Sequence, residues 1–360
     1  MFLAKGGGGV EMHVAKLAPR LVERGHQVTV YARRKYCNPC PAVLDGVDLR
    51  YTRTIYSKNL EAIVHTATAT FDVLFRKVDV IHYHGVGPAL LSWIPRLLRP
   101  RVTIVTTFHA RDQHHQKWNF IGRLALKTGE WMACKVPNAT ITISHTLQIV
   151  ARDEYGTEAI LIPNGAEIVT HRKHTALKEF GLKKNEFILN VGRILPVKGL
   201  HHLIKAFRRT KTDKKLVFVG DAPDDPSYLD ELKKLAKGDS RIMFLGRVSG
   251  EPVNQLFTHA YLFVQPSESE GLPIVVLEAM SNGTAVLVSD IPGNLEAIHR
   301  AGFTFENMNV DDLTVQLKNL LKHPELVEHA RHDVKKIIIK NFNWDTIADK
   351  TLDVYRSVRH

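Results

Sequence analysis

The segment "YLFVQPSESEGLPIVVLEAM" (residues 261–280) holds an apolar run, a short polar turn and a second apolar run. The first run is short and rich in aromatic and β-branched residues, which favours a buried strand over a helix. Pro273 suits the first turn of a following helix, because its missing N–H is not needed there. The segment therefore predicts a strand whose carboxyl end leads directly into a helix.

The same alternation extends over almost the whole chain. Short β-branched runs alternate with longer helical patterns, which is typical of parallel sheets with crossover helices. Strands are predicted at residues 27–33, 79–85, 102–109, 139–144 and 159–165, and again at 187–193, 215–221, 241–247, 261–267 and 284–290. The polar segment 167–186 separates the two series, and we place a hinge near residues 166–175. The pattern predicts an α/β protein with two doubly wound, Rossmann-like domains whose strand carboxyl ends face a common ligand-binding cleft.

Length and composition agree with two globular domains. The chain has 360 residues, of which 44% are hydrophobic and 24% charged, and one domain usually has roughly 100 to 200 residues. No apolar stretch reaches the about eighteen residues that span a bilayer, and the N-terminus lacks the pattern of a signal peptide. We therefore expect a cytoplasmic protein.

Two short segments invite interpretation as metal sites. Cys37 and Cys40 form a CxxC motif, but no second CxxC follows, so an unliganded loop is the better interpretation. The acidic segment "GDAPDDP" (220–226) follows a strand and contains two prolines, which favours a plain loop over a cation site. We expect no metal in the protein.

The net charge of +12 is unevenly distributed. Residues 1–168 carry 21 Lys and Arg against 13 Asp and Glu, a net charge of +8. This excess favours an anionic partner, either an acidic lipid surface or a phosphorylated substrate, although a merely soluble basic protein is an open alternative. Nucleic acid is not expected, because no reading module for it is present. The basic cluster "RLLRPR" (96–101) is a candidate for contact with a membrane surface.

A glycine-rich loop precedes the first predicted helix. In "GGGGVEMHVAKLAPRLVERGH" (6–26), Gly8 and Gly9 lie where the backbone can approach a phosphate at the positive end of a helix dipole. The loop is not a dinucleotide fingerprint, because Glu11 occupies the third glycine position. A flexible loop without a ligand remains the alternative.

Two cations follow the strand at 187–193. In "NVGRILPVKGL" (190–200), Gly192, Arg193 and Lys198 lie on the loop into the next helix. Cations at a helix N-terminus oppose its dipole unless an anion offsets them. A diphosphate would do so, because Arg grips two oxygens and Lys supplies a point charge. Solvated surface cations are the alternative.

Carboxylates flank the turn at the centre of the opening segment. Gly271 allows a tight turn after Glu270, and the N–H groups of residues 272–275 can hold a phosphate. Glu278, about a turn and a half into an apolar helix, can accept two hydrogen bonds from a ribose. Glu270 could hold sugar hydroxyls or a developing positive charge, although a solvated glutamate near a helix N-terminus would also suffice for it.

His109 closes the strand at 102–109 and is predicted to point into the same cleft. With a pKa near neutrality it can hydrogen-bond a substrate hydroxyl or move a proton. His84 ends another strand and has the same topology, with a weaker claim.

Taken together, these segments resemble the family 4 retaining glycosyltransferases, which have the GT-B fold. The resemblance covers nearly the whole chain. It rests on "GGGGVEMHVAKLAPRLVERGHQVTVY" (6–31), "TTFH" (106–109), "IPNG" (162–165), "VGRILPVKG" (191–199), "FLGRVS" (244–249), "SEGLPIVVLEAM" (269–280) and "FNWDTIADKTLDVYRSV" (342–358), in that family's order and spacing.

The resemblance implies transfer of a hexose-type sugar from a UDP- or GDP-linked donor to a hydroxyl of a lipid or glycan, with retention and without a metal. It assigns the diphosphate to Arg193 and Lys198, with Gly192 beside them. It also implies that His109 and Glu270 contact the donor sugar. These two residues, together with Arg193 and Lys198, form the implied catalytic set. Further implied donor contacts are the ribose at Glu278, the β-phosphate at backbone amides around Leu272 to Ile274, and the base near Arg247 and Val248. Gly271 and Pro273 also belong to the implied donor site, and Gly7, Gly8 and Gly9 would border the phosphate and the acceptor.

The resemblance also implies three segments: residues 1–168 for the acceptor, residues 169–341 for the nucleotide sugar, and a helix at 342–360 that crosses back. The family usually begins with an apolar strand, whereas "MFLA" is too short for one, so we expect a missing or shortened first strand. Apolar, basic helices at 59–77 and 119–135 favour a lipid-linked acceptor at the inner face of a membrane. A nucleotide-sugar epimerase and a non-catalytic nucleotide-sugar binder remain alternatives.

Overall fold

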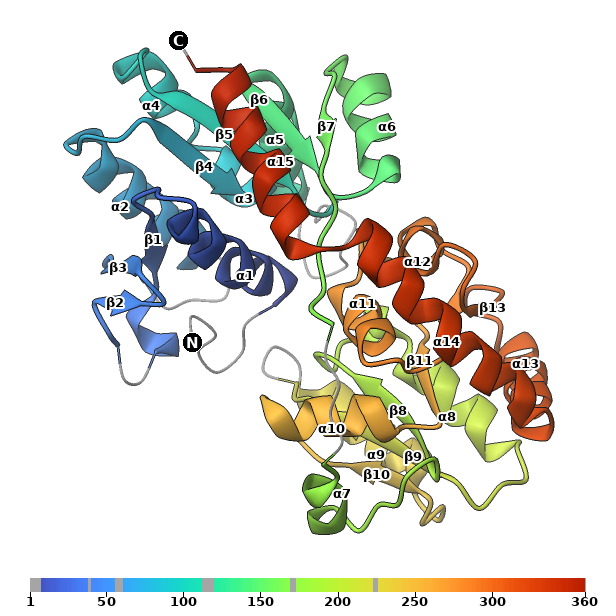
Figure 1. Cartoon of the computed structure of the whole chain (residues 1–360). Coiled ribbons are helices and arrows are strands. Elements are labelled where there is room, and N and C mark those ends of the chain that lie inside the picture. Colours follow the sequence, from blue (N-terminus) through green and yellow to red (C-terminus); the bar gives the residue numbers. More distant parts are fainter. Residues whose placement is uncertain are drawn as a thin grey trace. The chain divides into compact units, whose positions relative to one another are not determined.

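The computed structural model describes residues 8–37, 40–55, 61–111, 120–168, 173–222 and 226–359. The chain divides into two compact units, which are described here one at a time (Figure 1). Unit 1 comprises Met1–Asn164 and Trp344–His360, and unit 2 comprises Gly165–Asn343. The sequence analysis placed these boundaries at residues 168 and 341. Part of the hinge predicted near 166–175 lies outside the described residues.

Unit 2 contains one sheet of six parallel strands in the order β10-β9-β8-β11-β12-β13. The strands are β8 (Phe187–Val191), β9 (Lys215–Val219), β10 (Ile242–Phe244), β11 (Leu262–Gln265), β12 (Val286–Ser289) and β13 (Phe303–Phe305). From β8 the chain builds outward first through β9 and β10, and then on the other side through β11 and its successors. The strand order therefore reverses between β8 and β11, the point where doubly wound sheets bind ligands outside the carboxyl ends of their strands.

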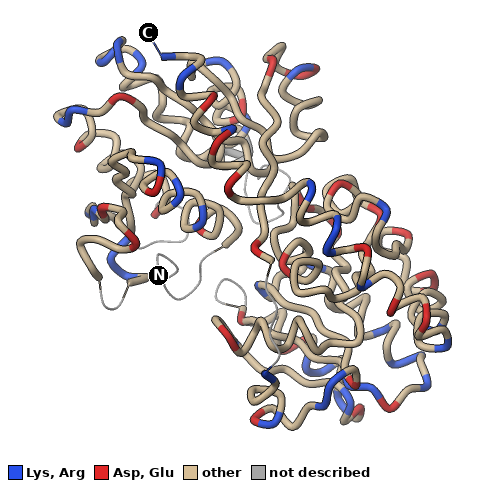
Figure 2. Tube along the Cα trace, viewed as in Figure 1, with Lys and Arg blue, Asp and Glu red and all other residues tan. Residues whose placement is uncertain are grey.

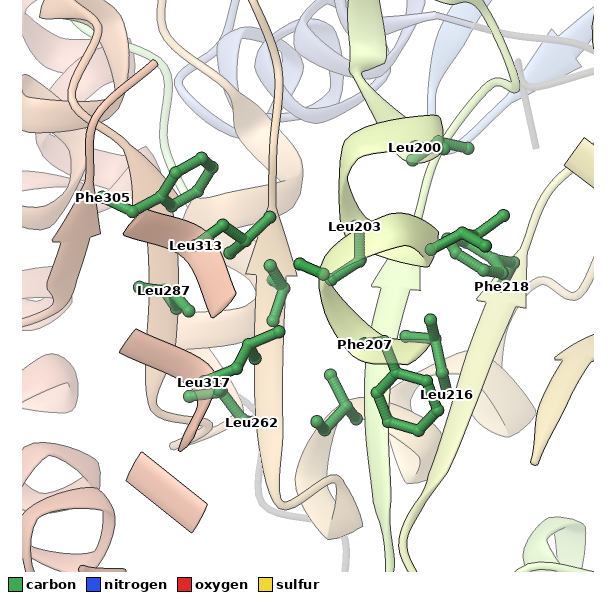
Figure 3. Packing of buried hydrophobic residues seen from close by; sticks show 14 of the residues in the cluster. Leu200, Leu203, Phe207, Leu216, Phe218, Leu262, Leu287, Phe305, Leu313 and Leu317 are labelled. Carbon is green, nitrogen blue, oxygen red and sulfur yellow. The ribbon is translucent and has the colours of Figure 1, made fainter. Parts of the chain in front are cut away.

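Helices connect these strands. They are α7 (Thr175–Glu179), η3 (Pro196–Lys198), α8 (Leu200–Arg208), α9 (Pro226–Ala236), α10 (Glu251–His259), α11 (Ile274–Ser281), α12 (Pro292–Ile298), α13 (Val310–Lys322) and α14 (Pro324–Asn341). In α8 the apolar residues Leu200, Leu203 and Phe207 recur at helical spacing and are all buried. Figure 3 shows them packed with Phe218 of β9, in a core that also takes Leu317 from α13. Burial of each such side chain contributes about 1.5–3 kcal/mol.

Unit 1 contains two sheets. A four-stranded parallel sheet has the order β4-β5-β6-β7, and a three-stranded sheet has the order β1-β3-β2, with β2 antiparallel to β3. The strands are β1 (Thr29–Ala32), β2 (Val43–Leu44), β3 (Val47–Tyr51), β4 (Val80–His84), β5 (Thr103–Phe108), β6 (Ala139–Thr142) and β7 (Ile160–Leu161). Within the described ranges, β1 and β4 each pair with a neighbour on one side only.

The helices of unit 1 include the last helix of the chain. They are α1 (Gly9–Glu23), η1 (Arg34–Tyr36), α2 (Glu61–Leu74), α3 (Val86–Ala89), α4 (Trp93–Leu98), α5 (Phe120–Lys135), α6 (His145–Tyr155) and α15 (Trp344–Ser357). Leu17 and Leu21 of α1 share a core with Trp344 and Ile347 of α15 and with Val105 of β5. This apolar contact explains why α15 belongs to unit 1 although unit 2 precedes it in the chain (Figure 1).

All ten strands predicted from the sequence are present. The prediction missed β2, β3 and β13, which are short or alternate buried with exposed residues, so that they lack a continuous apolar run. Within the described residues, no helix is long and apolar enough to cross a membrane.

Candidate functional site

Three loops of unit 2 meet in backbone contact at the carboxyl edge of its sheet. Gly199 has a φ of +63°, and a Cβ there would lie 2.0 Å from the carbonyl oxygen of Pro266, which follows β11. A Cβ on Gly220, after β9, would lie 1.8 Å from the oxygen of Gly192, after β8. Only glycine fits these contacts, because any side chain would push the loops apart.

Lys198 and Glu270 form an ion pair at the point where the strand order reverses. The Lys198 Nζ donates to Glu270 Oε1 at 2.5 Å, and the two side chains are 22% and 12% exposed. Lys198 ends the loop after β8 and Glu270 lies in the loop after β11. The backbone also links these loops, because the Glu268 N–H donates to the Val197 carbonyl at 2.9 Å. The structure therefore unites two predicted site residues from separate motifs.

A polar network holds the Glu270 carboxylate in place. Gln265 Nε2 and Ser267 Oγ donate to Glu270 Oε1 at 2.9 and 2.7 Å. Gln265 is buried at the end of β11 and also donates to Ser267 Oγ at 2.7 Å. Behind it, the buried Asn190 of β8 donates to the Val264 carbonyl at 2.8 Å. Gln265 and Ser267 fix the orientation of the carboxylate and stabilise its charge.

The Glu270 carboxylate stays ionised although it is largely buried. Burial by itself would raise the pKa of Glu270, but the nearby charge of Lys198 and the hydrogen bonds from Lys198, Ser267 and Gln265 outweigh it and lower the pKa. The site thus keeps a fixed negative charge next to a cation that a ligand can also reach.

The helix α11 begins directly after Glu270. Pro273 is its N-cap residue, with a ψ of 107°, and not part of its first turn as the sequence analysis predicted. No side chain caps this helix within the described part of the chain, so the N–H groups of Ile274 and Val275 face the loop end, whereas the Val276 N–H donates to the Pro273 carbonyl at 3.1 Å. Glu278 is half-buried on α11, whereas Val276 and Leu277 are fully buried.

The remaining predicted donor contacts in unit 2 lie on loops at the same edge. Gly192 and Arg193 follow β8, and Arg193 is exposed. Arg247, also exposed, and Val248, half-buried, follow β10. Gly271 and the buried Leu272 lie between Glu270 and Pro273. Because parallel strands end at one edge of a sheet, the topology brings these segments together.

In unit 1, His109 lies at the end of β5 within a buried group of imidazoles. His84 Nδ1 and His109 Nε2 are 3.2 Å apart, and the ring of His13, from α1, meets the His109 ring edge-on at 4.9 Å between centroids. His82 stacks on His84 at 4.1 Å. The sequence pointed to His84 and His109 but not to His13 or His82. Neither of these two lies at the carboxyl end of a predicted strand, and the chain has 19 histidines in all.

Burial lowers the pKa of His109 well below its ordinary value, and the neighbouring imidazoles of His13 and His82 lower it further. A pKa near neutrality, predicted from the sequence, is therefore wrong for His109. His109 is therefore neutral at neutral pH, and it is suited to hydrogen-bonding a hydroxyl and not to carrying a positive charge.

The glycine loop leads into α1 as predicted. Gly7 lies outside the described residues, whereas Gly8 precedes α1 and Gly9 is its first residue. The Gly8 N–H donates to Glu11 Oε2 at 2.9 Å, and Glu11 also pairs with Arg33 at 3.2 Å. A carboxylate of the chain itself thus lies at this helix N-terminus, where an anion is stabilised.

Comparison with known families matches nearly the whole of this architecture. A family model described as Glycosyltransferase Family 4 matches residues 7–169, and one described as Glycosyl transferases group 1 matches residues 172–337. The alpha-maltose-1-phosphate synthase of Mycobacterium tuberculosis is 33% identical over 310 residues, covering 78% of this chain and 79% of that protein. The chain is a family 4 glycosyltransferase. A further relative, a glycosyltransferase of Methanocaldococcus jannaschii, is 26% identical and covers 97% of this chain and 94% of its own length.

Solved structures show that this glycosyltransferase has the GT-B fold. The sucrose-phosphate synthase from Thermosynechococcus elongatus has a TM-score of 0.84 at 19% identity, covering 98% of this chain and 94% of that chain. The Anabaena protein HepE in complex with UDP-glucose has a TM-score of 0.81 at 19% identity, covering 98% and 96%.

The glycosyltransferase has two groups of side chains that could hold a metal ion, among the residues described. They are His13, His84 and His109 in unit 1, and His201, His202 and Glu268 in unit 2. Neither group includes the CxxC motif or the acidic segment 220–226, the two segments that the sequence suggests for a metal. Cys37 and Cys40 are free thiols, and residues 223–225 of the acidic segment lie outside the described residues.

Proposed function

We propose that this glycosyltransferase transfers a hexose-type sugar from a UDP- or GDP-linked donor to a hydroxyl of a lipid or glycan acceptor, with retention of configuration. The observation that carries the proposal is the Lys198–Glu270 pair at the point where the strand order reverses, next to the uncapped N-terminus of α11. The Anabaena structures with UDP and UDP-glucose support a nucleotide-sugar donor.

In the proposed reaction, Arg193, Lys198 and the first N–H groups of α11 bind the donor diphosphate. Negative charge grows on the diphosphate oxygen as its bond to the sugar breaks. Cations and helix N–H groups that are already in place stabilise that charge without reorganisation. The acceptor oxygen forms the new bond to the same carbon, and its proton passes to the departing diphosphate.

Glu270 supplies the negative charge of the proposed site. The sugar carbon becomes positively charged in the transition state, and the ionised carboxylate, fixed by Gln265 and Ser267, stabilises that charge or holds sugar hydroxyls. In the proposed complex, the neutral imidazole of His109 forms a hydrogen bond to the donor sugar, and Glu278 binds the ribose. Arg247 and Val248 remain the proposed contacts of the base.

The same arrangement supports a reaction without a metal. Two cationic side chains and a helix N-terminus supply the positive charge that a divalent ion would bring to a diphosphate. We therefore expect that treatment with a chelator does not lower the transfer rate. A loss of activity that added Mg²⁺ restores would contradict this part of the proposal.

The acceptor side of the proposal rests on an exposed apolar surface of unit 1. Phe71 and Phe75 of α2 are 65% and 77% exposed, and their rings contact each other at 5.2 Å. Trp93, Leu97 and Leu98 of the neighbouring α4 are also exposed. Figure 2 shows Lys and Arg around α4, within the predicted basic cluster 96–101. Apolar side chains rimmed by cations suit the surface of an anionic membrane.

Peripheral binding at the inner face of a membrane would therefore bring the glycosyltransferase to a lipid-linked acceptor. Sedimentation with anionic vesicles should occur at low salt, decline as salt screens the charges, and weaken in a Phe75→Ser, Leu97→Ser variant. Absence of sedimentation at low salt would remove the lipid acceptor from the proposal and leave a glycan.

A thermal-shift panel of UDP, GDP, ADP and their sugars tests the donor site. A ligand at a hundred times its Kd stabilises the folded state by about 2.7 kcal/mol. The shift should be lost in an Arg193→Ala, Lys198→Ala variant and retained in Lys233→Ala, Lys234→Ala, which removes two exposed cations of α9. No shift with any nucleotide would overturn the proposal.

Product analysis separates the transferase from its two alternatives. An epimerase would convert the donor sugar without an acceptor, and a non-catalytic binder would show the nucleotide shift without turnover. Transfer only in the presence of an acceptor, with the anomeric configuration of the donor retained, is the result that we expect.

A further inference from the structure

Three imidazoles from separate elements of unit 1 converge in its interior. His13 comes from α1, His84 from the end of β4, and His109 follows β5. One ring nitrogen of each lies within 4.8 Å of those of the other two. His13 and His109 are buried and His84 is half-buried, so the group has one side that solvent or a ligand can reach.

Neighbouring side chains fix the orientation of these rings. His13 Nδ1 donates to Asn164 Oδ1 at 2.9 Å, which leaves the lone pair of its Nε2 available. His84 Nδ1 and His109 Nε2 are 3.2 Å apart and share one hydrogen between two nitrogens. Imidazole ligands of metal ions typically have this kind of support, in which the second nitrogen donates to an amide or carboxylate oxygen.

We propose that His13, His84 and His109 bind a transition-metal ion of the zinc class. With Zn–N bonds of 2.0–2.1 Å, tetrahedral coordination places ligand nitrogens about 3.3 Å apart. The His84–His109 separation of 3.2 Å already matches this distance. The ion would draw His13 inward, and the hydrogen between His84 and His109 would move to the other ring nitrogen of the imidazole that carries it. Water or a substrate hydroxyl would supply the fourth ligand on the half-buried side.

A fourth imidazole, that of His82, lies beside this group. His82 is not a ligand, because its Nδ1 and Nε2 both lie 2.7 Å from hydroxyls, of Tyr355 and Thr107. Its ring stacks on His84 and limits the movement of that ligand.

The second group, His201, His202 and Glu268, is a rival for the same ions. His202 Nε2 lies 3.4 Å from Glu268 Oε1, and His202 Nδ1 is buried without a hydrogen-bond partner among the described residues. However, His201 Nδ1 already contacts the Tyr228 hydroxyl at 2.8 Å. Metal binding to unit 1 must therefore be measured in a variant in which this second group cannot bind the ion.

A metal at this triad would act on the reaction as an inhibitor, and this consequence rests on the proposed function. The ion would occupy a ring nitrogen of His109, the residue that the proposal assigns to the donor sugar. Zinc should then lower the rate of transfer without weakening binding of the nucleotide to unit 2. Metal binding itself does not depend on the proposed function, and it is measured separately.

Calorimetric titration of the metal-free full chain with Zn²⁺ tests the site, in a His201→Gln, His202→Gln background. We expect one ion per chain. An added His84→Gln change should weaken binding by at least about tenfold, since loss of even a supporting residue costs 10–100-fold. The matched control is His26→Gln, which removes an exposed histidine of unit 1 and should leave binding unchanged. No bound Zn²⁺ in the background protein, or equal binding in the His84→Gln variant, would overturn the proposal.

Imidazole nitrogen NMR spectra of the background protein settle the outcome if His84→Gln fails to fold. One equivalent of Zn²⁺ should shift ring nitrogens of His13, His84 and His109 and leave the hydrogen-bonded nitrogens of His82 in place. Shifts confined to other histidines would overturn the site. Zinc binding without inhibition would leave the site standing and reject only its link to the proposed reaction.

Discussion

The two units bury ionisable side chains at the ends of their strands with opposite results. In unit 2, Glu270 is largely buried and remains ionised, because Lys198 and two hydrogen-bond donors lie around its carboxylate. In unit 1, the half-buried His84 and the buried His109 lie among other imidazoles, and their pKa values fall well below the ordinary range. Burial is common to both, so the difference arises from the neighbours that each group meets.

An opposite charge within contact distance stabilises the ionised form, whereas a neighbour of the same type can only oppose it. The unit 2 site thus holds fixed charges, as binding of a diphosphate requires. The unit 1 site holds neutral rings that can hydrogen-bond a sugar or coordinate an ion. Three measurements can break or sharpen this contrast.

Removal of the unit 2 cation should have the largest effect. Lys198→Met leaves the Glu270 carboxylate buried without its countercharge, so its pKa should rise as burial becomes dominant. Transfer should slow by about 10²–10³-fold, the usual loss for one preorganised electrostatic contact. The free energy of unfolding should fall by about 3 kcal/mol, as for other broken buried pairs. Steady-state kinetics and calorimetry measure the two effects.

A double-variant cycle separates the pair from its parts. Lys198→Met combined with Glu270→Gln should recover most of the lost stability but none of the activity, because the unpaired charge is gone while the cation is still missing. Lys183→Met, at an exposed pair with Glu186, should leave activity unchanged. If Lys198→Met unfolds no more easily than Lys183→Met, the contrast between the units is wrong.

Acid should destabilise unit 1 more than unit 2, where burial also lowers the pKa values of His201 and His259. Burial lowers the pKa of His13 to about 4 and that of His82 to about 3, from 6.5 in the unfolded chain. The stability that comes from their neutral rings is fully present above pH 6.5. It is lost as pH falls toward the pKa values of the folded state, because the unfolded chain then binds protons that the native unit does not. Each histidine should lower the free energy of unfolding by about 1.4 kcal/mol for each pH unit below 6.5 in that window. The pKa of Glu270 is lowered from 4.5, so the stability that its charge contributes is present above pH 4.5 and does not change between pH 7 and pH 5.

Tryptophan fluorescence can follow this effect, since all four tryptophans of the sequence fall within the residue ranges of unit 1. Urea midpoints measured between pH 7 and pH 5 should decline. A His82→Gln variant, which keeps a polar group near Tyr355 and Thr107, should show a shallower decline. An unchanged slope would mean that the imidazoles of the His13, His82, His84 and His109 group do not titrate as described.

Backbone contacts in unit 2 give the smallest expected effect. Gly199 and Gly181 have nearly equal φ angles, +63° and +62°, but a Cβ at Gly199 would lie 2.0 Å from the Pro266 oxygen while Gly181 has nothing within 4 Å. Alanine at both positions carries the same backbone strain. Gly199→Ala should therefore destabilise unit 2 by about 1–3 kcal/mol more than Gly181→Ala, and should also weaken the nucleotide thermal shift. Equal losses would show that the loops after β8 and β11 are not held by this contact.

Much of the fold was predictable because strand and helix periodicities are local. The long apolar strands β5, β8 and β9 were identified from residue type alone, whereas β13, with three residues, carries too little pattern. The sequence also pointed to Lys198 and Glu270 separately. It did not indicate Gln265 and Ser267 as partners of that carboxylate, nor Asn190 behind them, because polar residues at strand ends are common and their directions depend on the packed sheet.

Local chemistry along the chain determined the alternation of elements, the family and the residue types that can bind a diphosphate, since these depend on side chains only a few positions apart. Tertiary structure decided the charge states. Lys198 and Glu270 are 72 positions apart, and His13 and Asn164 are 151 apart, yet each pair is in contact. A pKa depends on burial and on neighbours in space, and packing alone brings such neighbours together. For that reason the same chain holds a charged site in one unit and a neutral one in the other.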